Sequence, residues 1–220
     1  MRRLGKKYLL IGILMVILFV CWTLLIQIID VQSIGQNGTD VGFATLNTWF
    51  HQLTGVNMFI FTITDWLGLV PILICIVFAM IGFTQMIKRK SILKVDLDII
   101  LLGIYYFIVI IGYLLFEIIP INYRPILIDG RLEASYPSST TLLVLCVMPT
   151  LMLQIKRRVK NIRLVKIINP LIIVFTSFMV IGRLLSGVHW LTDIIGAILL
   201  SIGLFCLYYG VVILYCKEER

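Results

Sequence analysis

The sequence predicts an all-α, polytopic membrane protein built as a bundle of six transmembrane helices. Three observations support this prediction: 60% of the 220 residues are hydrophobic, these residues form long uncharged runs, and basic residues gather between the runs. Soluble domains average roughly 45–50% apolar residues. A helix needs roughly 20 apolar residues to cross a bilayer. Six runs approach that length, at residues 8–29, 67–87, 99–116, 134–155, 167–182 and 194–216.

The first run begins at Tyr8, directly behind a basic N-terminal segment. A signal peptide starts in the same way, but its apolar region is only about 7–15 residues long and a small-residue cleavage site follows it. Residues 8–29 are longer than that, and no Ala-x-Ala-like site comes after them. We therefore interpret this run as a retained helix.

The other runs follow without an internal repeat or a linker, so residues 1–220 are expected to form a single membrane domain. The fifth run is short and ends at Arg183, whose long side chain can reach towards the interface. The connection after the first run is the longest. Its apolar residues at helical spacing favour an amphipathic interfacial helix, with a loop packed over the bundle as the alternative; they are Phe43, Leu46, Trp49, Phe50 and Leu53.

Basic residues predict the orientation of the helices, because cytoplasmic loops carry an excess of Lys and Arg. Sixteen of the 19 Lys and Arg residues lie in the two termini and in the second and fourth connections. The other three are Arg124, Arg131 and Arg183. Both termini are therefore predicted to be cytoplasmic, in what we expect to be the cell (plasma) membrane, with the first, third and fifth connections facing outwards.

The net charge of +8 would suggest a nucleic-acid partner in a soluble protein. Here the basic loops explain the charge, since they set the topology and contact anionic lipid headgroups. No nucleic-acid partner is expected. The five cysteines are scattered without metal-ligand spacing, so neither disulfides nor a metal site is predicted.

Two of the outward arginines lie near other polar residues in the sequence. Arg183 opens a segment that contains His189 and Asp193, and Arg124 follows an Asn-Tyr pair. One guanidinium group can donate to two phosphate oxygens at once. His189 and Asp193 are four residues apart, so they share a helix face if the sixth helix begins near them. Asp193 could then orient the imidazole.

A hydroxyl-rich turn, residues 136–141, opens the fourth run and includes Ser138 and Ser139. The first N–H groups of a helix form a natural anion site. Taken singly, such features have ordinary explanations: an interfacial Arg anchor, a solvated His, or a helix N-cap. Together, on one face of the membrane, they indicate a phosphate site.

These residues resemble three signatures of the type 2 phosphatidic acid phosphatase (PAP2) superfamily. The third signature, Arg-x5-His-x3-Asp, is matched by Arg183, His189 and Asp193. The second, Pro-Ser-Gly-His, is similar to Pro137-Ser138-Ser139-Thr140, and the first, Lys-x6-Arg-Pro, to Glu117-x6-Arg124-Pro125. The resemblance implies that His189 attacks phosphorus and becomes a phosphohistidine, with Asp193 behind it and the two arginines on the phosphate.

Three positions depart from the family pattern. Gly182 replaces a Ser, Glu117 replaces a Lys, and Thr140 replaces the His that protonates the leaving oxygen. A threonine hydroxyl cannot act as an acid near neutral pH, and general acid catalysis is worth roughly 10²–10⁴-fold. His51, the other histidine, is a possible substitute acid; the alternative is an interfacial His on the amphipathic helix.

The sequence therefore predicts a PAP2-type phosphatase, without cofactor or metal, acting on a membrane lipid phosphate or diphosphate. A non-catalytic relative that binds a phosphorylated lipid is the alternative. An ion-coupled transporter is less favoured, because transporters carry ionisable residues near mid-membrane, whereas Asp65, Glu117 and Asp193 lie near span ends. The identity of the lipid and the oligomeric state do not follow from the sequence.

Overall fold

The computed structural model describes residues 2–216, and Lys217 and Arg220 of the C-terminal tail lie outside the described residues. Within that range the chain forms α-helices joined by loops, with two short 3-10 turns and no β-strand. The helices are α1 (Arg2–Ile26), α2 (Ala44–Thr54), α3 (Met58–Leu67), α4 (Leu69–Arg89), α5 (Leu97–Ile118), α6 (Ser139–Arg158), α7 (Ile162–Leu185) and α8 (Leu191–Tyr215).

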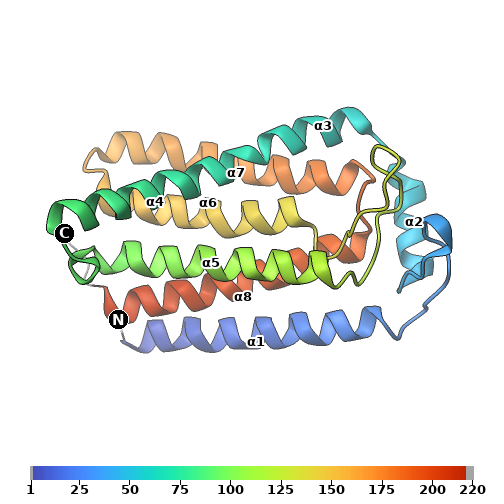
Figure 1. The fold of residues 1–220 in the computed structure, drawn as a ribbon, viewed down its shortest axis with the longest axis horizontal. Coiled ribbons are helices and arrows are strands. Elements are labelled where there is room, and N and C mark those ends of the chain that lie inside the picture. The colour runs from blue at the N-terminus through green and yellow to red at the C-terminus, as the bar shows by residue number, and fades with distance from the viewer. Residues whose placement is uncertain (1, 217–220) are drawn as a thin grey trace.

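Six helical segments of residues 2–216 are long and apolar enough to cross a membrane, which confirms the predicted fold class. They run roughly side by side along the molecule (Figure 1). Helices α3 and α4 together form one such segment, Met58–Arg89, which is divided at Gly68. The Gly68 N–H donates to the carbonyls of Thr64 and Asp65, so the chain turns there without losing its backbone hydrogen bonds.

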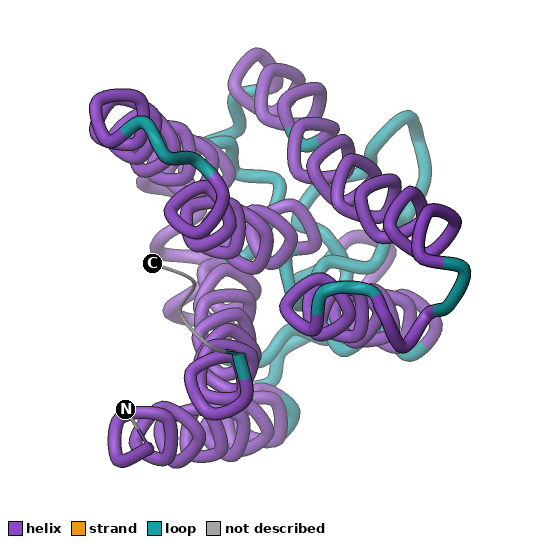
Figure 2. Tube along the Cα trace, turned by 90° about the vertical axis from the view of Figure 1, so that its left-hand side faces the viewer, coloured by secondary structure: helices purple, strands orange, loops and turns teal. Residues whose placement is uncertain are grey.

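Helix α8 lies at the centre of the packing and carries the candidate site at its N-terminal end. It packs along α1 and also contacts α5, α6 and α7. Gly12 of α1 allows the close approach, since a Cβ there would lie 2.8 Å from Leu207. Figure 2 shows the helices from the end of the bundle. Leu102, Val147 and Ala197 are fully buried between them.

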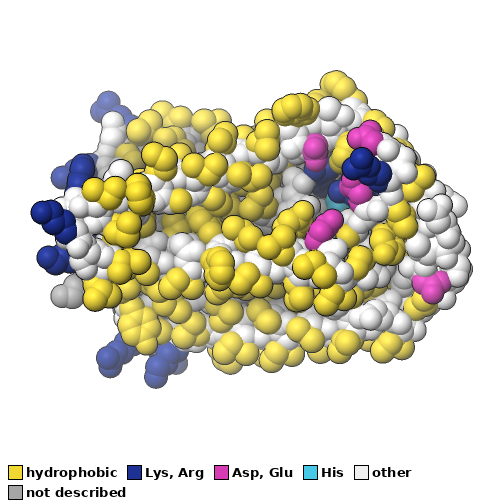
Figure 3. All heavy atoms as spheres, in the orientation of Figure 1, with side chains coloured by type: hydrophobic (Ala, Val, Ile, Leu, Met, Phe, Trp, Pro, Cys, Tyr) yellow, Lys and Arg dark blue, Asp and Glu magenta, His cyan; other side chains and the backbone are white. Residues whose placement is uncertain are grey.

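The two ends of the bundle differ in chemistry. Lys and Arg side chains cluster at the end where α1 begins and α8 ends, and an apolar belt covers the middle (Figure 3). The opposite end carries α2 and the loops that join α1 to α2 and α5 to α6 (Figure 1). The fold therefore separates a basic end from an end where Asp, Glu, Arg and His side chains meet in a hollow (Figure 3).

Helix α2 is the helix expected in the long first connection. Its apolar side chains Leu46, Trp49 and Leu53 are exposed. Asn47 is buried instead, and its side-chain amide donates to the Gly42 carbonyl at 2.8 Å and to Thr192 Oγ1 at 3.0 Å. The polar contact attaches α2 to the start of α8 and leaves an apolar face outwards, as an interfacial helix requires.

Candidate active site

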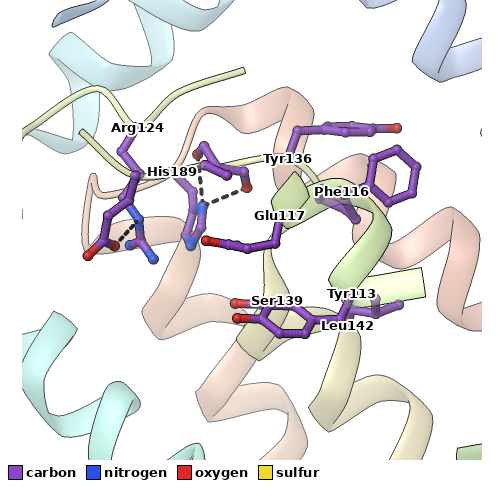
Figure 4. Close-up of a pocket in the computed structure, with 12 residues that line it drawn as sticks. Tyr113, Phe116, Glu117, Arg124, Tyr136, Ser139, Leu142 and His189 are labelled. Atoms are coloured by element: carbon purple, nitrogen blue, oxygen red, sulfur yellow. Dashed lines mark hydrogen bonds and ion pairs between the residues drawn. The ribbon is translucent and has the colours of Figure 1, made fainter. Parts of the chain in front are cut away.

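The predicted site residues come together at the end of the bundle opposite the termini. Arg183 lies in the last turn of α7, His189 in the loop that follows, and Asp193 in the first turn of α8. A cavity of about 200 Å³ opens beside them. Its walls carry Tyr113, Phe116, Glu117, Arg124, Glu133, Ala134, Ser135, Tyr136, Pro137, Ser139, Leu142 and His189 (Figure 4).

The connection between α5 and α6 supplies one wall by folding back on itself. The Ser135 N–H donates to the Asn122 carbonyl at 2.9 Å, and the Arg124 N–H donates to the Glu133 carbonyl at 3.1 Å. This short antiparallel pairing places Arg124 and Ser135 beside the α7–α8 loop. Ser135 thereby contacts His189, and Arg124 lines the same cavity.

Ser135 determines which nitrogen of His189 carries the proton. His189 Nδ1 lies 3.2 Å from the Ser135 carbonyl, which can only accept, so Nδ1 is the donor. Ser135 Oγ lies 3.0 Å from the same nitrogen and donates its own proton to Asp193 Oδ2. The hydrogen-bond chain therefore runs from His189 through Ser135 to Asp193, and Nε2 keeps its lone pair.

Asp193 is held from three sides. Its carboxylate accepts the Trp190 N–H at 2.9 Å and the Asn122 amide at 3.2 Å, in addition to the Ser135 hydroxyl. Its distance to His189 Nδ1 is 3.8 Å, too long for a direct hydrogen bond. Asp193 therefore acts on the imidazole mainly through Ser135, a bridging residue that the sequence did not indicate.

His189 Nε2 is buried and has no hydrogen-bond partner. Burial lowers the pKa of His189 to about 4, and the nearby charges of Arg124 and Arg183 lower it too, against the opposing effect of Asp193. The imidazole is therefore neutral at physiological pH. A neutral ring with a free Nε2 lone pair is the form in which histidine acts as a nucleophile.

Both arginines carry guanidinium nitrogens without partners. Arg183 Nη2 donates to Asp65 Oδ1 and to Thr140 Oγ1, each at 2.6 Å, but its Nε and Nη1 are buried and unpaired. Arg124 lies 3.1 Å from Glu133 through Nε, and its Nη1 is also buried without a partner. Buried unsatisfied donors on charged groups are costly, and Arg124, which lines the cavity, can donate to an anion placed there.

The hydroxyl-rich turn contributes less than its sequence suggested. The Ser138 N–H donates to the Asp193 carbonyl at 3.2 Å, and its hydroxyl donates to Thr141 Oγ1 at 3.0 Å. Ser138 is therefore occupied in joining α6 to α8. Ser139, the first residue of α6, does line the cavity, and its position at the helix N-terminus suits an anion.

The three departures from the family pattern all lie close to the site. Thr140 bonds Arg183, as described above. Glu117 points across the cavity towards the imidazole (Figure 4). Gly182 packs so closely on α3 that a Cβ would lie 2.7 Å from Thr64 Cγ2, which explains why a serine is not accommodated there.

His51 is not among the cavity-lining residues. It lies on α2 behind the α7–α8 loop, where its Nε2 is 3.1 Å from the Gly187 carbonyl and its ring is 5.6 Å from that of Trp190. The geometry thus ties His51 to the loop that carries His189 and gives it no direct position in the cavity.

Fold and site together define an integral membrane protein with a polar cavity beside a buried histidine. The family model of the PAP2 superfamily matches residues 72–214, and the chain belongs to that superfamily. The resemblance predicted from the three signatures is thereby confirmed.

A solved structure extends the similarity to the whole fold. A transmembrane PAP2-type phosphatidylglycerolphosphate phosphatase from Bacillus subtilis superposes with a TM-score of 0.64 at 16% identity, covering 95% of this chain and 98% of that one. A search of curated proteins gave no match.

Proposed function

We propose that this protein is a phosphatase that hydrolyses a membrane lipid phosphate or diphosphate through a phosphohistidine. One observation carries the proposal: a neutral His189 with an unpaired Nε2 lines the same cavity as unpaired donors of Arg124. Arg183, with its own unpaired donors, is close enough to affect the charge state of His189. A nucleophile and anion-binding donors facing one space are what phosphoryl transfer requires.

In the first step His189 Nε2 attacks phosphorus, an N–P bond forms, and the bond from phosphorus to the leaving oxygen breaks. The imidazole becomes positively charged while Nδ1 keeps its proton, and the Ser135–Asp193 chain stabilises that charge. Arg124 and Arg183 stabilise the charge on the phosphoryl oxygens. In the second step water attacks phosphorus and the N–P bond breaks, with its electron pair returning to His189 Nε2. Inorganic phosphate leaves carrying the protons of the attacking water, and the neutral imidazole is restored.

The leaving group determines which substrate suits this site. Thr140 supplies no acid, and its hydroxyl is bonded to Arg183. A lipid alcoholate is about as basic as hydroxide, and the pKa of water is about 15.7. A lipid monophosphate leaving from a diphosphate is far less basic, since the second phosphate pKa is about 6. We propose a preference for lipid diphosphates, such as isoprenoid diphosphates.

The test is phosphate release by the purified protein from matched lipid monophosphates and diphosphates. Wild type should have the higher kcat/KM on the diphosphate, and Thr140→His should raise activity on the monophosphate more than on the diphosphate. Equal or better wild-type activity on the monophosphate would show that another group supplies the proton.

Two of the departures from the family pattern, Thr140 and Glu117, favour a second function. Thr140 removes the acid, and Glu117 adds a negative charge to the cavity wall. A protein with these residues could bind a phosphorylated lipid without turnover. Binding of lipid phosphates together with no phosphate release from any substrate would favour this alternative.

We also propose that the site faces outwards from the cell membrane and that both termini are cytoplasmic. The distribution of basic residues supports this orientation. Single cysteines can be placed at the exposed positions Arg131 and Lys90, after replacement of the five native cysteines. An impermeant thiol reagent added to whole cells should label position 131 and not position 90. The reverse pattern would overturn the orientation.

A further inference from the structure

Helix α3 presents one face to the two arginines. Phe61 and Asp65 are four residues apart and thus share a face. Asp65 bonds Arg183, and the Phe61 ring lies under the guanidinium groups of both arginines, 4.9 Å from Arg183 Cζ and 5.9 Å from Arg124 Cζ. These α3 residues precede the segment that the family model matches, which begins at residue 72.

Asp65 limits how the Arg183 guanidinium can turn. A guanidinium group is planar, with its donors in a rigid fork. Because Asp65 and Thr140 both accept from Nη2 at 2.6 Å, one corner of the plane is fixed. The free donors, Nε and Nη1, are then turned away from Asp65 and remain unpaired. The pairing uses one nitrogen and leaves the others for a phosphate.

The guanidinium groups of Arg124 and Arg183 both contact the Phe61 ring. Cations are attracted to the face of an aromatic ring within about 6 Å of its centroid, and both guanidinium carbons lie within that distance of Phe61. The ring therefore favours two like charges near one another before an anion arrives. A phosphate bound by both arginines would need them in that arrangement.

The position of α3 is itself set by close packing against α7. Gly182 leaves room for Thr64, which is fully buried. The Asn57 N–H, just before α3, donates to the Ser186 carbonyl at 3.0 Å. Contacts at both ends of the Arg183 turn thus fix α3 relative to the α7–α8 loop.

We propose that Phe61 and Asp65 are positioning residues that hold the two phosphate-binding arginines in the geometry of the transition state. The kinetic measurements that test this inference rest on the proposed function. The Asp65 side chain is 60% exposed, whereas that of Arg183 is 1% exposed. Solvent screens the exposed carboxylate, but its removal leaves the buried Arg183 charge without its ionic partner, so we expect Asp65→Ala to lower stability as well as activity and anion binding.

The experiment uses the full chain in detergent, with Asp65→Asn, Asp65→Ala and Phe61→Leu. Thr62→Ala is the matched control, since Thr62 lies on the same helix, is exposed, and bonds only the Met58 carbonyl. We expect Asp65→Ala to lower kcat by about 10–10²-fold, the order expected for small misplacements of catalytic groups. Its KM should change less. Asp65→Asn should recover most of the loss, because its amide oxygen can still accept from Arg183.

Two further measurements separate positioning from a structural role. The inhibition constant of orthovanadate, which mimics the five-coordinate phosphorus, should rise in Asp65→Ala and Phe61→Leu by about the same factor as kcat/KM falls. The melting temperature of Asp65→Asn should match that of Thr62→Ala, and Asp65→Ala should remain folded at the assay temperature. Unchanged kcat and vanadate inhibition in Asp65→Ala, or a loss accompanied by a collapse of the melting temperature in both Asp65 variants, would overturn the proposal.

Binding of inorganic phosphate, measured as thermal stabilisation, tests the inference without turnover. If wild type binds phosphate but releases none from lipids, the proposed function fails. The positioning role would then still require about tenfold weaker phosphate binding in Asp65→Ala than in Thr62→Ala. Equal binding in the two variants would refute it.

Discussion

The polar clusters at the two ends of the bundle contain the same kinds of side chains but differ in how completely they are paired. At the basic end, Arg158 donates to Gln154 at 2.9 Å and to Asp98 at 2.7 Å, and lies 3.5 Å from Asp96. Asp96 also accepts from Gln85 and Arg89. These charged groups have partners within the protein.

At the opposite end, three side chains keep buried polar atoms without hydrogen-bond partners among the described residues. They are His189 at Nε2, Arg124 and Arg183. We propose that this difference distinguishes two roles of buried charge in the chain: a completed network holds helices together, and an incomplete one is completed by a ligand. The following predictions test that distinction, from the largest expected effect to the smallest.

Replacing the nucleophile should have the largest effect. His189→Ala should lower phosphate release by roughly 10⁴-fold or more, the scale seen when a covalent nucleophile is removed. His189→Ala removes the Nδ1 hydrogen bond to Ser135, but the protein should stay folded because Ser135 keeps its bond to Asp193. Phosphate release and the melting temperature in detergent are the measurements. Undiminished release would refute the catalytic role of His189.

Removing the bridge between His189 and Asp193 should have an intermediate effect. Ser135→Ala takes away the hydroxyl that links the two side chains but keeps the carbonyl that fixes Nδ1 as a donor. We expect kcat to fall by about 10–10²-fold, because one hydrogen bond to a charged group is worth about 1.5–3 kcal/mol. Steady-state kinetics on the preferred lipid would measure it. A kcat equal to wild type would mean that Asp193 acts without the bridge.

A substitution in the fully paired network around Arg158 should lower stability and leave activity unchanged. Arg158→Ala leaves Asp98 with Arg157 alone, whose Nε is 4.0 Å away. We expect the free energy of unfolding to fall by about 1–3 kcal/mol, with kcat/KM unchanged. Thermal unfolding in detergent and lipid hydrolysis, measured on the same preparation, check both halves. A large drop in kcat/KM at unchanged stability would break the comparison.

The smallest effect concerns pH. The pKa of His189 is lowered to about 4 from an ordinary value of 6.5. The neutral, nucleophilic form should therefore persist as the pH falls through 6.5 and be lost only near pH 4. NMR of ¹⁵N-labelled histidine should report a neutral Nδ1–H ring at pH 5.5, with the His51 signals identified from a His51→Gln variant. A midpoint near 6.5 would contradict the burial argument.

The sequence predicted the helices and the local part of the site, for physical reasons. Long apolar runs reveal membrane spans directly, and Arg183, His189 and Asp193 lie within one turn-loop-turn segment. Their spacing along the chain therefore implies their proximity.

The rest of the site depends on contacts between distant segments. Ser135 reaches His189 because the α5–α6 connection folds back on itself, and Asp65 reaches Arg183 because α3 packs on α7. Neither residue has a spacing signal that pairs it with its partner. Ser138 was predicted as an anion ligand by the same local rule; its N–H donates to the Asp193 carbonyl of a distant segment and its hydroxyl to the nearby Thr141.

The contact between Gly182 and Thr64 couples the residues that these two positions can hold. A serine at position 182 would place its Cβ 2.7 Å from the Thr64 methyl group, so Gly182→Ser requires the Thr64 side chain or α3 to shift. Thr64→Ser removes that methyl group, so the pair Thr64→Ser and Gly182→Ser should be better tolerated than Gly182→Ser alone. The identity of a residue on α3 thus sets which side chain fits beside Arg183 on α7.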